Sequence, residues 1–112
     1  MLQITEITEE PKQKHLLDIA GYEPAALYLE FRPNQNAWFF GLEWQTFATY
    51  NIQLTKNYNI LRQFKNVIPF GIIIYTKSGQ DPMTDDAFSS GDAQFFLLTA
   101  SEVIELEAAL YA

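Results

Sequence analysis

Two runs of alternating apolar residues, separated by a short turn, place the strongest constraint on the fold of this 112-residue chain. On the first run one face would carry Leu27, Leu29 and Phe31, and on the second Trp38, Phe40, Leu42 and Trp44. Alternation with period two is typical of a strand with one buried face. The intervening Pro33-Asn34-Gln35-Asn36 favours a turn, because Pro presets φ and Asn tolerates the left-handed region. The stretch therefore predicts an antiparallel hairpin with an aromatic inner face.

Short β-like segments make up most of the remaining chain. Further strands are predicted at 2–7, 14–19, 51–55, 72–75 and 93–98. The continuous β-branched run at 72–75 favours a strand buried on both faces. Segment 58–64 fits either a strand or a single helical turn, and 77–92 is a loop rich in Ser, Gly, Asp and Pro.

A helix is predicted at the C-terminal end. Thr99-Ala100-Ser101-Glu102 is a capping-box pattern, and the helix would continue to about Leu110. Val103, Leu106 and Leu110 share one face, which would dock on a sheet. The predicted fold is therefore mainly β: a small antiparallel β-sandwich or barrel with one C-terminal α-helix, in a single domain spanning 1–112.

Composition excludes several classes of function. The chain has no Cys, so it has no disulfide scaffold, Cys zinc site or thiol nucleophile. Residues 1–10 contain three Glu and no apolar run, which does not fit a secretory signal. Apolar stretches such as 72–75 are far shorter than the roughly 20 residues of a membrane-spanning helix.

The formal net charge of −7 is unevenly distributed. Residues 1–65 hold seven acids and six bases, whereas residues 66–112 hold seven acids and one base. An acidic C-terminal part repels phosphate and anionic lipid, and no basic stripe is visible. We therefore expect neither specific nucleic-acid binding nor insertion into a membrane.

Asp81, Asp85, Asp86 and Asp92 form the first candidate for chemistry. Carboxylates of this kind can hold Ca²⁺ or Mg²⁺. The spacing lacks the alternating acids and closing Glu of a calcium loop. We interpret the four residues as an acidic surface on a solvated loop, without a metal or cofactor.

The sequence contains no strong pattern of catalytic residues. His15 is the only histidine, and no serine lies in a nucleophile-elbow pattern. Glu30 and Glu43 would face each other across the predicted hairpin, but an ordinary surface pair explains them as well as a glycosidase pair. No phosphate loop or dinucleotide fingerprint is present. We predict no enzymatic activity.

Aromatic residues are concentrated between 38 and 50. Trp38 would fill the core, whereas Phe39 would lie on the opposite face, exposed or covered by a partner. Phe39 and Tyr50 could form part of a carbohydrate platform, but core packing plus a subunit contact is the favoured interpretation. The excess of apolar surface indicates an interaction protein.

The order of these features resembles the small baseplate plug proteins of tailed bacteriophages, of the cyanophage contractile-tail type. The resemblance covers residues 14–98. Its motifs are an early Gly-Tyr, the turn-containing run 31–40, Asn59-Ile60-Leu61, Ile68-Pro69-Phe70-Gly71, an acidic loop ending near Phe88, and Phe95-Phe96-Leu97-Leu98. The sequence departs from the family pattern in having Ile60-Leu61 in place of a Leu pair, and Phe70 where Gly is frequent.

The resemblance implies a virion component at the tail tip, bound to hub and tail-tube proteins and present in several copies of a symmetric assembly. It implies no catalytic residues, and Trp38, Pro69 and Gly71 carry over only as fold-defining positions. The acidic part would repel passing DNA if it lined the tube lumen. The alternative is a small β-module that binds a carbohydrate or protein ligand without catalysis.

Overall fold

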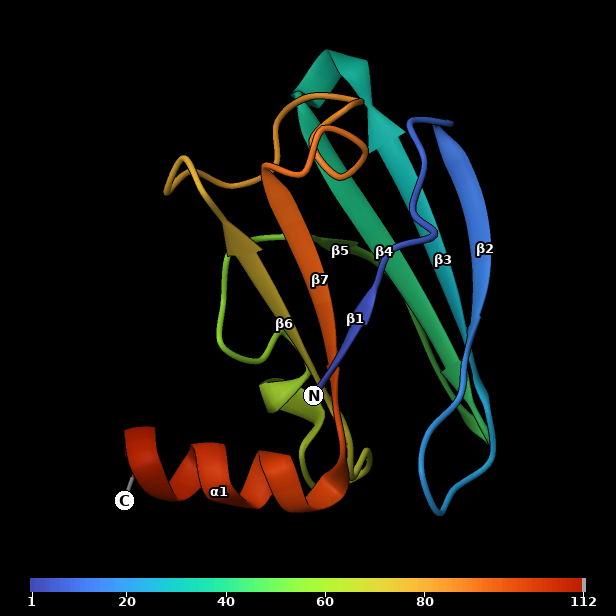
Figure 1. Ribbon diagram of the computed structural model, residues 1–112. Coiled ribbons are helices and arrows are strands. Elements are labelled where there is room, and N and C mark those ends of the chain that lie inside the picture. The colour runs from blue at the N-terminus through green and yellow to red at the C-terminus, as the bar shows by residue number, and fades with distance from the viewer. Residues whose placement is uncertain (112) are drawn as a thin grey trace.

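The computed structural model describes residues 1–111 as two antiparallel sheets packed face to face, with a helix at one end (Figure 1). One sheet has three strands in the order β1 (Leu2–Ile4), β7 (Ala93–Leu98), β6 (Gly71–Thr76). The other has four, in the order β2 (Lys12–Leu17), β3 (Ala25–Arg32), β4 (Ala37–Trp44), β5 (Phe47–Gln53). The predicted sandwich is confirmed, and the two sheets do not close into a barrel.

The predicted hairpin is β3 and β4. Leu29 pairs with Phe40 and Phe31 with Trp38, so the two apolar faces coincide. The turn contains the short 3₁₀ helix η1 (Pro33–Gln35) and ends at Asn36, whose φ of 49° lies in the left-handed region. Trp38, Phe40 and Leu42 are buried, as the alternation predicts.

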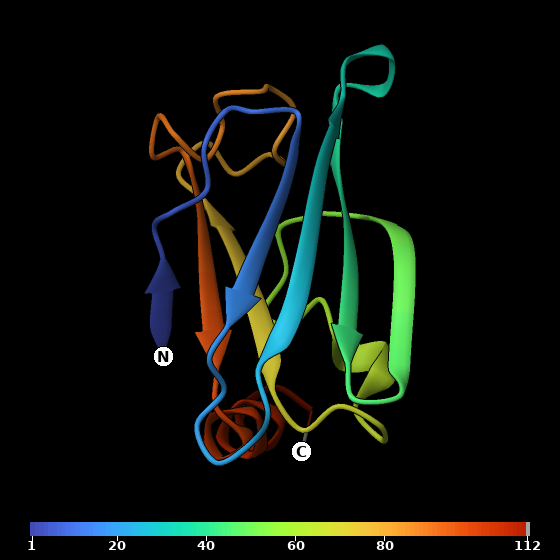
Figure 2. The ribbon, with the colours of Figure 1, turned by 90° about the vertical axis from the view of Figure 1, so that its right-hand side faces the viewer.

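The core lies between the sheets and draws side chains from both. Trp44 of β4 packs edge-to-face against Phe70, with ring centroids 5.6 Å apart. Trp38 packs in the same way against Phe88, at 5.5 Å, and its indole N–H donates to the Thr84 carbonyl at 2.9 Å. The long loop 77–92 thus closes one end of the sandwich over the aromatic core, as Figure 2 shows from the side.

Residues 54–70 cross from one sheet to the other. Asn57 and Ile74 exchange two backbone hydrogen bonds of 3.0 Å, so this segment covers part of the free edge of β6. It then forms η2 (Arg62–Phe64), a single 3₁₀ turn. Of the two predicted alternatives for 58–64, the structure therefore has the helical turn.

Several strand boundaries differ from the prediction. β1 is shorter than 2–7, β2 spans 12–17 and not 14–19, and β5 begins at Phe47 and not at Asn51. β5 starts early because a tight turn joins it directly to β4, with Gln45 at a φ of 54° in place of the expected Gly or Asn. The prediction that 72–75 is buried on both faces is wrong, since Tyr75 is 52% exposed on the outer face of β6.

The helix α1 (Ala100–Tyr111) begins with the predicted capping box. The Thr99 backbone N–H donates to the Glu102 carboxylate at 3.0 Å, and the Glu102 N–H donates to the Thr99 hydroxyl at 3.3 Å. The predicted docking face is only partly confirmed, because Val103 is buried whereas Leu110 is 43% exposed. The helix runs across the end of the sandwich (Figure 1), so only its first turns meet the core. Within residues 1–111, no helix has the length and apolar character needed to span a bilayer.

Candidate functional site

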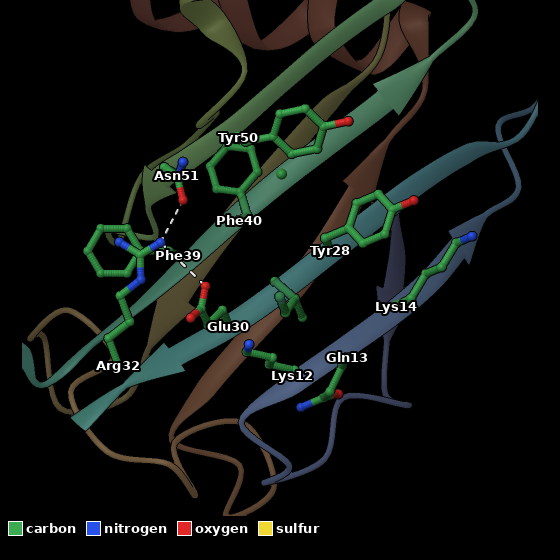
Figure 3. Close-up of a pocket in the computed structure, with 12 residues that line it drawn as sticks. Lys12, Gln13, Lys14, Tyr28, Glu30, Arg32, Phe39, Phe40, Tyr50 and Asn51 are labelled. Atoms are coloured by element: carbon green, nitrogen blue, oxygen red, sulfur yellow. Dashed lines mark hydrogen bonds and ion pairs between the residues drawn. The ribbon is translucent and has the colours of Figure 1, made fainter.

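The outer face of the four-stranded sheet carries an open groove of about 440 Å³ (Figure 3). We call it the outer groove, and its walls include Lys12, Lys14, Tyr28, Phe39, Tyr50 and Asn51. Successive side chains in a strand point to opposite faces, so these residues lie on the side away from the core. Four consecutive strands, β2 to β5, thus supply one surface.

A β-bulge shapes one wall of the outer groove. Phe40 pairs with Ile52 and Leu42 pairs with Thr49, so Gly41 faces two residues, Tyr50 and Asn51. Asn51 has a φ of 61°, and both residues are exposed on the outer face. Bulges re-aim side chains in this way. The bulge therefore places an aromatic ring and an amide side by side.

Gly41 forms the floor beneath Tyr50. A Cβ on this glycine would lie 2.6 Å from Cδ1 of the Tyr50 ring and 3.1 Å from the Thr49 carbonyl oxygen. The absence of a side chain lets the ring lie close against the sheet. Tyr50 is still 51% exposed, so it presents a fixed aromatic surface to solvent.

The Glu43 carboxylate forms hydrogen bonds with two tyrosines of the groove. Its Oε1 accepts from the Tyr28 hydroxyl at 2.9 Å, and its Oε2 accepts from the Tyr50 hydroxyl. The Tyr50 hydrogen bond, then that of Tyr28, then the charge of Lys14 lower the pKa of Glu43 below its usual value of 4.5. The bond to Glu43 raises the pKa of Tyr50 in turn. At neutral pH the carboxylate is an anion that fixes both rings, not a proton donor.

Arg32 covers the other aromatic ring of the groove. Its guanidinium lies 4.1 Å from the centroid of Phe39, and it donates to Glu30 at 3.3 Å and to Asn51 at 2.6 Å. Figure 3 shows the cation lying over this ring. Phe39 was expected to be exposed or covered by a partner, and the structure shows that its own chain covers it. The open aromatic surface of the groove is therefore that of Tyr50 with Tyr28.

The predicted cross-strand pair of Glu30 and Glu43 does not form. Glu30 lies opposite Phe39, whereas Glu43 lies opposite Ala26, four positions further along β4. At a rise of about 3.3 Å per residue, that offset is about 13 Å. Glycosidase carboxyl groups lie about 5–9.5 Å apart. The hairpin register thus separates the two carboxylates beyond the range of that chemistry.

His15 lies on the other face of β2 from Lys14. Its register partner is the buried Leu27, and its Nε2 is 2.9 Å from the Gln13 side-chain oxygen. Within residues 1–111, no hydrogen bond joins it to a serine or a carboxylate. The histidine thus belongs to a local contact within its own strand.

Three of the four acidic residues of loop 77–92 form hydrogen bonds that shape the loop. Asp81 accepts from the Lys56 N–H at 2.8 Å, Asp86 from the Thr84 hydroxyl at 2.7 Å, and Asp92 from the Ser78 N–H at 3.0 Å. Asp85 is exposed. In the described part of the chain, no three His, Cys, Asp or Glu residues are grouped so that they could hold a metal ion. The carboxylates shape the loop and leave an acidic outer surface.

Gly71 and Pro69, singled out with Trp38 as fold-defining, flank the buried Phe70. Gly71 begins β6, where its bare α-carbon leaves room for the side chain of Asn59. Pro69 is only half-buried. The sequence analysis named Asn59 only as part of the Asn59-Ile60-Leu61 motif, without a structural role, and it did not predict the Glu43–Tyr50 pair. An Asn inside the apolar run 58–61 was a signal for the first, but nothing local indicated the second.

No family model matches this sequence, and no curated protein shows significant similarity to it.

Proposed function

We propose that this protein is a non-catalytic structural component of a phage tail baseplate, which plugs the tail-tube end by binding hub and tube proteins. The main support is that the motifs shared with baseplate plug proteins contribute to a single core. Trp38, Ile60, Phe70 and Phe95 lie in separate motifs, yet all are buried in one core. The side chain of Asn59 also lies against the bare α-carbon of Gly71, so two of the motifs meet directly. Motifs that meet in this way support a shared architecture.

Two chemically different outer faces support a role between different neighbours. The strands β1, β6 and β7 contain no charged residue, and Tyr75 is half exposed on their outer side. The four-stranded sheet instead carries the outer groove, with lysines, an arginine and tyrosines. An uncharged aromatic face and a polar aromatic face suit two different protein partners.

Mass spectrometry of tail particles purified from the phage that encodes this chain tests the proposal. The chain is expected in intact tails, at a fixed ratio to the hub protein. A deletion mutant is expected to make tails with unsealed tube ends, and a copy of the gene supplied in trans should restore them. Infectious particles of normal morphology that lack the chain would contradict the proposal.

The outer groove supports a second candidate, a carbohydrate-binding module. Aromatic rings with adjacent carboxylate and amide groups suit stacking and hydrogen bonding to sugars, and Tyr50, Glu43 and Asn51 meet here. Binding on a glycan array that Tyr50→Ala abolishes would support this function. Tyr75→Ala is the matched control, since Tyr75 is equally exposed but lies on the other sheet. A blank array would exclude it.

A further inference from the structure

The outer groove is cationic on a strongly acidic protein. Within residues 1–111, the outward face of β2 to β5 holds three bases and two acids. The rest of the chain holds four bases and twelve acids. A positively charged surface on a negatively charged protein attracts a negatively charged surface of a partner. This chain itself supplies an abundance of acidic surface.

The cationic wall is the strand β2. Lys12 and Lys14 are exposed, and neither forms an ion pair in the described part of the chain. The two acids of the face have partners of their own, because Glu30 pairs with Arg32 and Glu43 accepts from two tyrosines. The Lys14 ammonium lies near the Tyr28 ring and the charge of Glu43, but neither lysine is held in an ion pair within residues 1–111, so both can meet an external anion.

The opposite wall and the floor are aromatic. Tyr50 is half exposed, and Tyr28 lies 6.3 Å from it and 5.5 Å from the Lys14 ammonium. A complementary segment would thus combine acidic groups for the lysines with an apolar side chain for the tyrosines. It would also have to project from its own molecule, because the groove is open and shallow.

The segment 83–86 of this chain has that chemistry. Asp85 and Asp86 are exposed, and Met83 beside them is 47% exposed. The buried Trp38 indole holds the Thr84 carbonyl at 2.9 Å, so the segment is fixed at the end of the sandwich. Trp38 is buried in the core on the inner face of β4, whereas the groove lies on the outer face of the four-stranded sheet (Figure 3). The segment and the groove of one molecule therefore face in different directions, and each can contact a second copy.

We propose that copies of this protein associate head to tail, with the acidic segment 83–86 of one copy seated in the outer groove of the next. Asp85 and Asp86 face Lys12 and Lys14, and Met83 packs against the tyrosines. Such a contact joins two different surfaces, so repetition closes into a ring or continues as a filament. This contact rests on the proposed baseplate role, and it adds to that role the way in which the copies bind one another.

Charge reversal tests this contact on the full chain. Sedimentation velocity and native mass spectrometry should show concentration-dependent association of the natural protein. Lys12→Glu/Lys14→Glu and Asp85→Lys/Asp86→Lys should each weaken association by about tenfold or more, since each places like charges together. An equimolar mixture of the two variants should associate again, because both contacts between them are then complementary. Glu23→Lys/Glu105→Lys is the control: it makes the same change of net charge at two exposed residues outside the groove and outside segment 83–86, and it should not abolish association.

The outcomes separate this inference from the proposed function. A natural protein that stays monomeric, or variants that remain apart when mixed while circular dichroism shows both folded, would overturn the head-to-tail contact. If the same chain is then found in purified tails, the contact fails and the baseplate role stands. If it associates as expected but is absent from tails, the baseplate role fails and the contact stands.

Discussion

The side chain of Asn59 lies against the bare α-carbon of Gly71, where an added Cβ would stand 2.9 Å from both its Oδ1 and its Nδ2. Asn59 is 4% exposed, and its Oδ1 accepts from the backbone N–H of Leu61 at 3.0 Å and of Ile72 at 3.1 Å. One buried amide thus joins the crossover segment to the start of β6. The amide accepts from two backbone N–H groups that have no hydrogen-bond partner within either sheet.

Asn59→Ala should lower the free energy of unfolding by about 2–4 kcal/mol, because it leaves two buried N–H groups without an acceptor. Urea denaturation measures this change. Asn57→Ala is the control, since Asn57 is exposed and its side chain accepts a single bond, from the Asn59 N–H at 3.2 Å. That variant should lose about 1 kcal/mol or less. Equal losses in both variants would refute the special role of Asn59.

Gly71→Ala should destabilise the protein by about 1–3 kcal/mol, since the new methyl group displaces the Asn59 amide. The same change in the Asn59→Ala background should cost clearly less, because the obstructing atoms are gone. A double-mutant cycle by urea denaturation measures this coupling. Additive losses would show that Gly71 serves some purpose other than making room for Asn59.

The carboxylate of Glu43 should titrate below its usual pKa of 4.5, chiefly because the Tyr50 hydroxyl donates to it. Since the folded pKa is the lower one, the stabilisation is present above the unfolded pKa and is lost as the pH falls through the folded pKa. NMR titration of the carboxyl carbon should show the pKa rising towards 4.5 in Tyr50→Phe. It should not move in Tyr75→Phe, which lacks contact with Glu43.

Local pattern was enough to predict the hairpin, the strand at 93–98 and the capping box of the helix. Each of these depends on residues close in sequence: the alternation around Trp38, the apolar run from Phe95, and the spacing of Thr99 and Glu102. The interior of the sandwich followed from the same alternation, because inward positions of β3 and β4 had to face another layer.

The candidate site depends on pairing between strands, which local pattern does not specify. The bulge was detectable in part, because the inward positions of β5 change from odd, at Phe47 and Thr49, to even, at Ile52. The contact of Glu43 with Tyr50 requires that bulge together with the β4–β5 register. The crossover that buries Asn59 depends on loop closure across two sheets, for which no short motif exists.

Trp38→Phe should free one end of the long loop 77–92, because it removes the indole N–H that holds the Thr84 carbonyl. We expect a loss of about 2–4 kcal/mol in unfolding free energy and faster tryptic cleavage after Lys77. Trp44→Phe is a matched control, since the Trp44 indole donates to the Glu23 carbonyl at 3.0 Å, elsewhere in the fold. That variant should be destabilised without faster cleavage in the loop. Cleavage at the natural rate in Trp38→Phe would show that other contacts hold the loop.

The first turn of α1 should contribute most of the docking energy of the helix. Val103 is 8% exposed, whereas Leu110 is 43% exposed and Ile104 is 71% exposed. Val103→Ala should therefore cost about 1–2 kcal/mol of unfolding free energy, because it leaves a buried void. Leu110→Ala should stay within about 0.5 kcal/mol of the natural protein, as is usual for a surface position. Thermal and urea denaturation measure both changes. A larger loss at Leu110 than at Val103 would mean that the far end of the helix packs on the sheet, as its apolar periodicity alone had predicted.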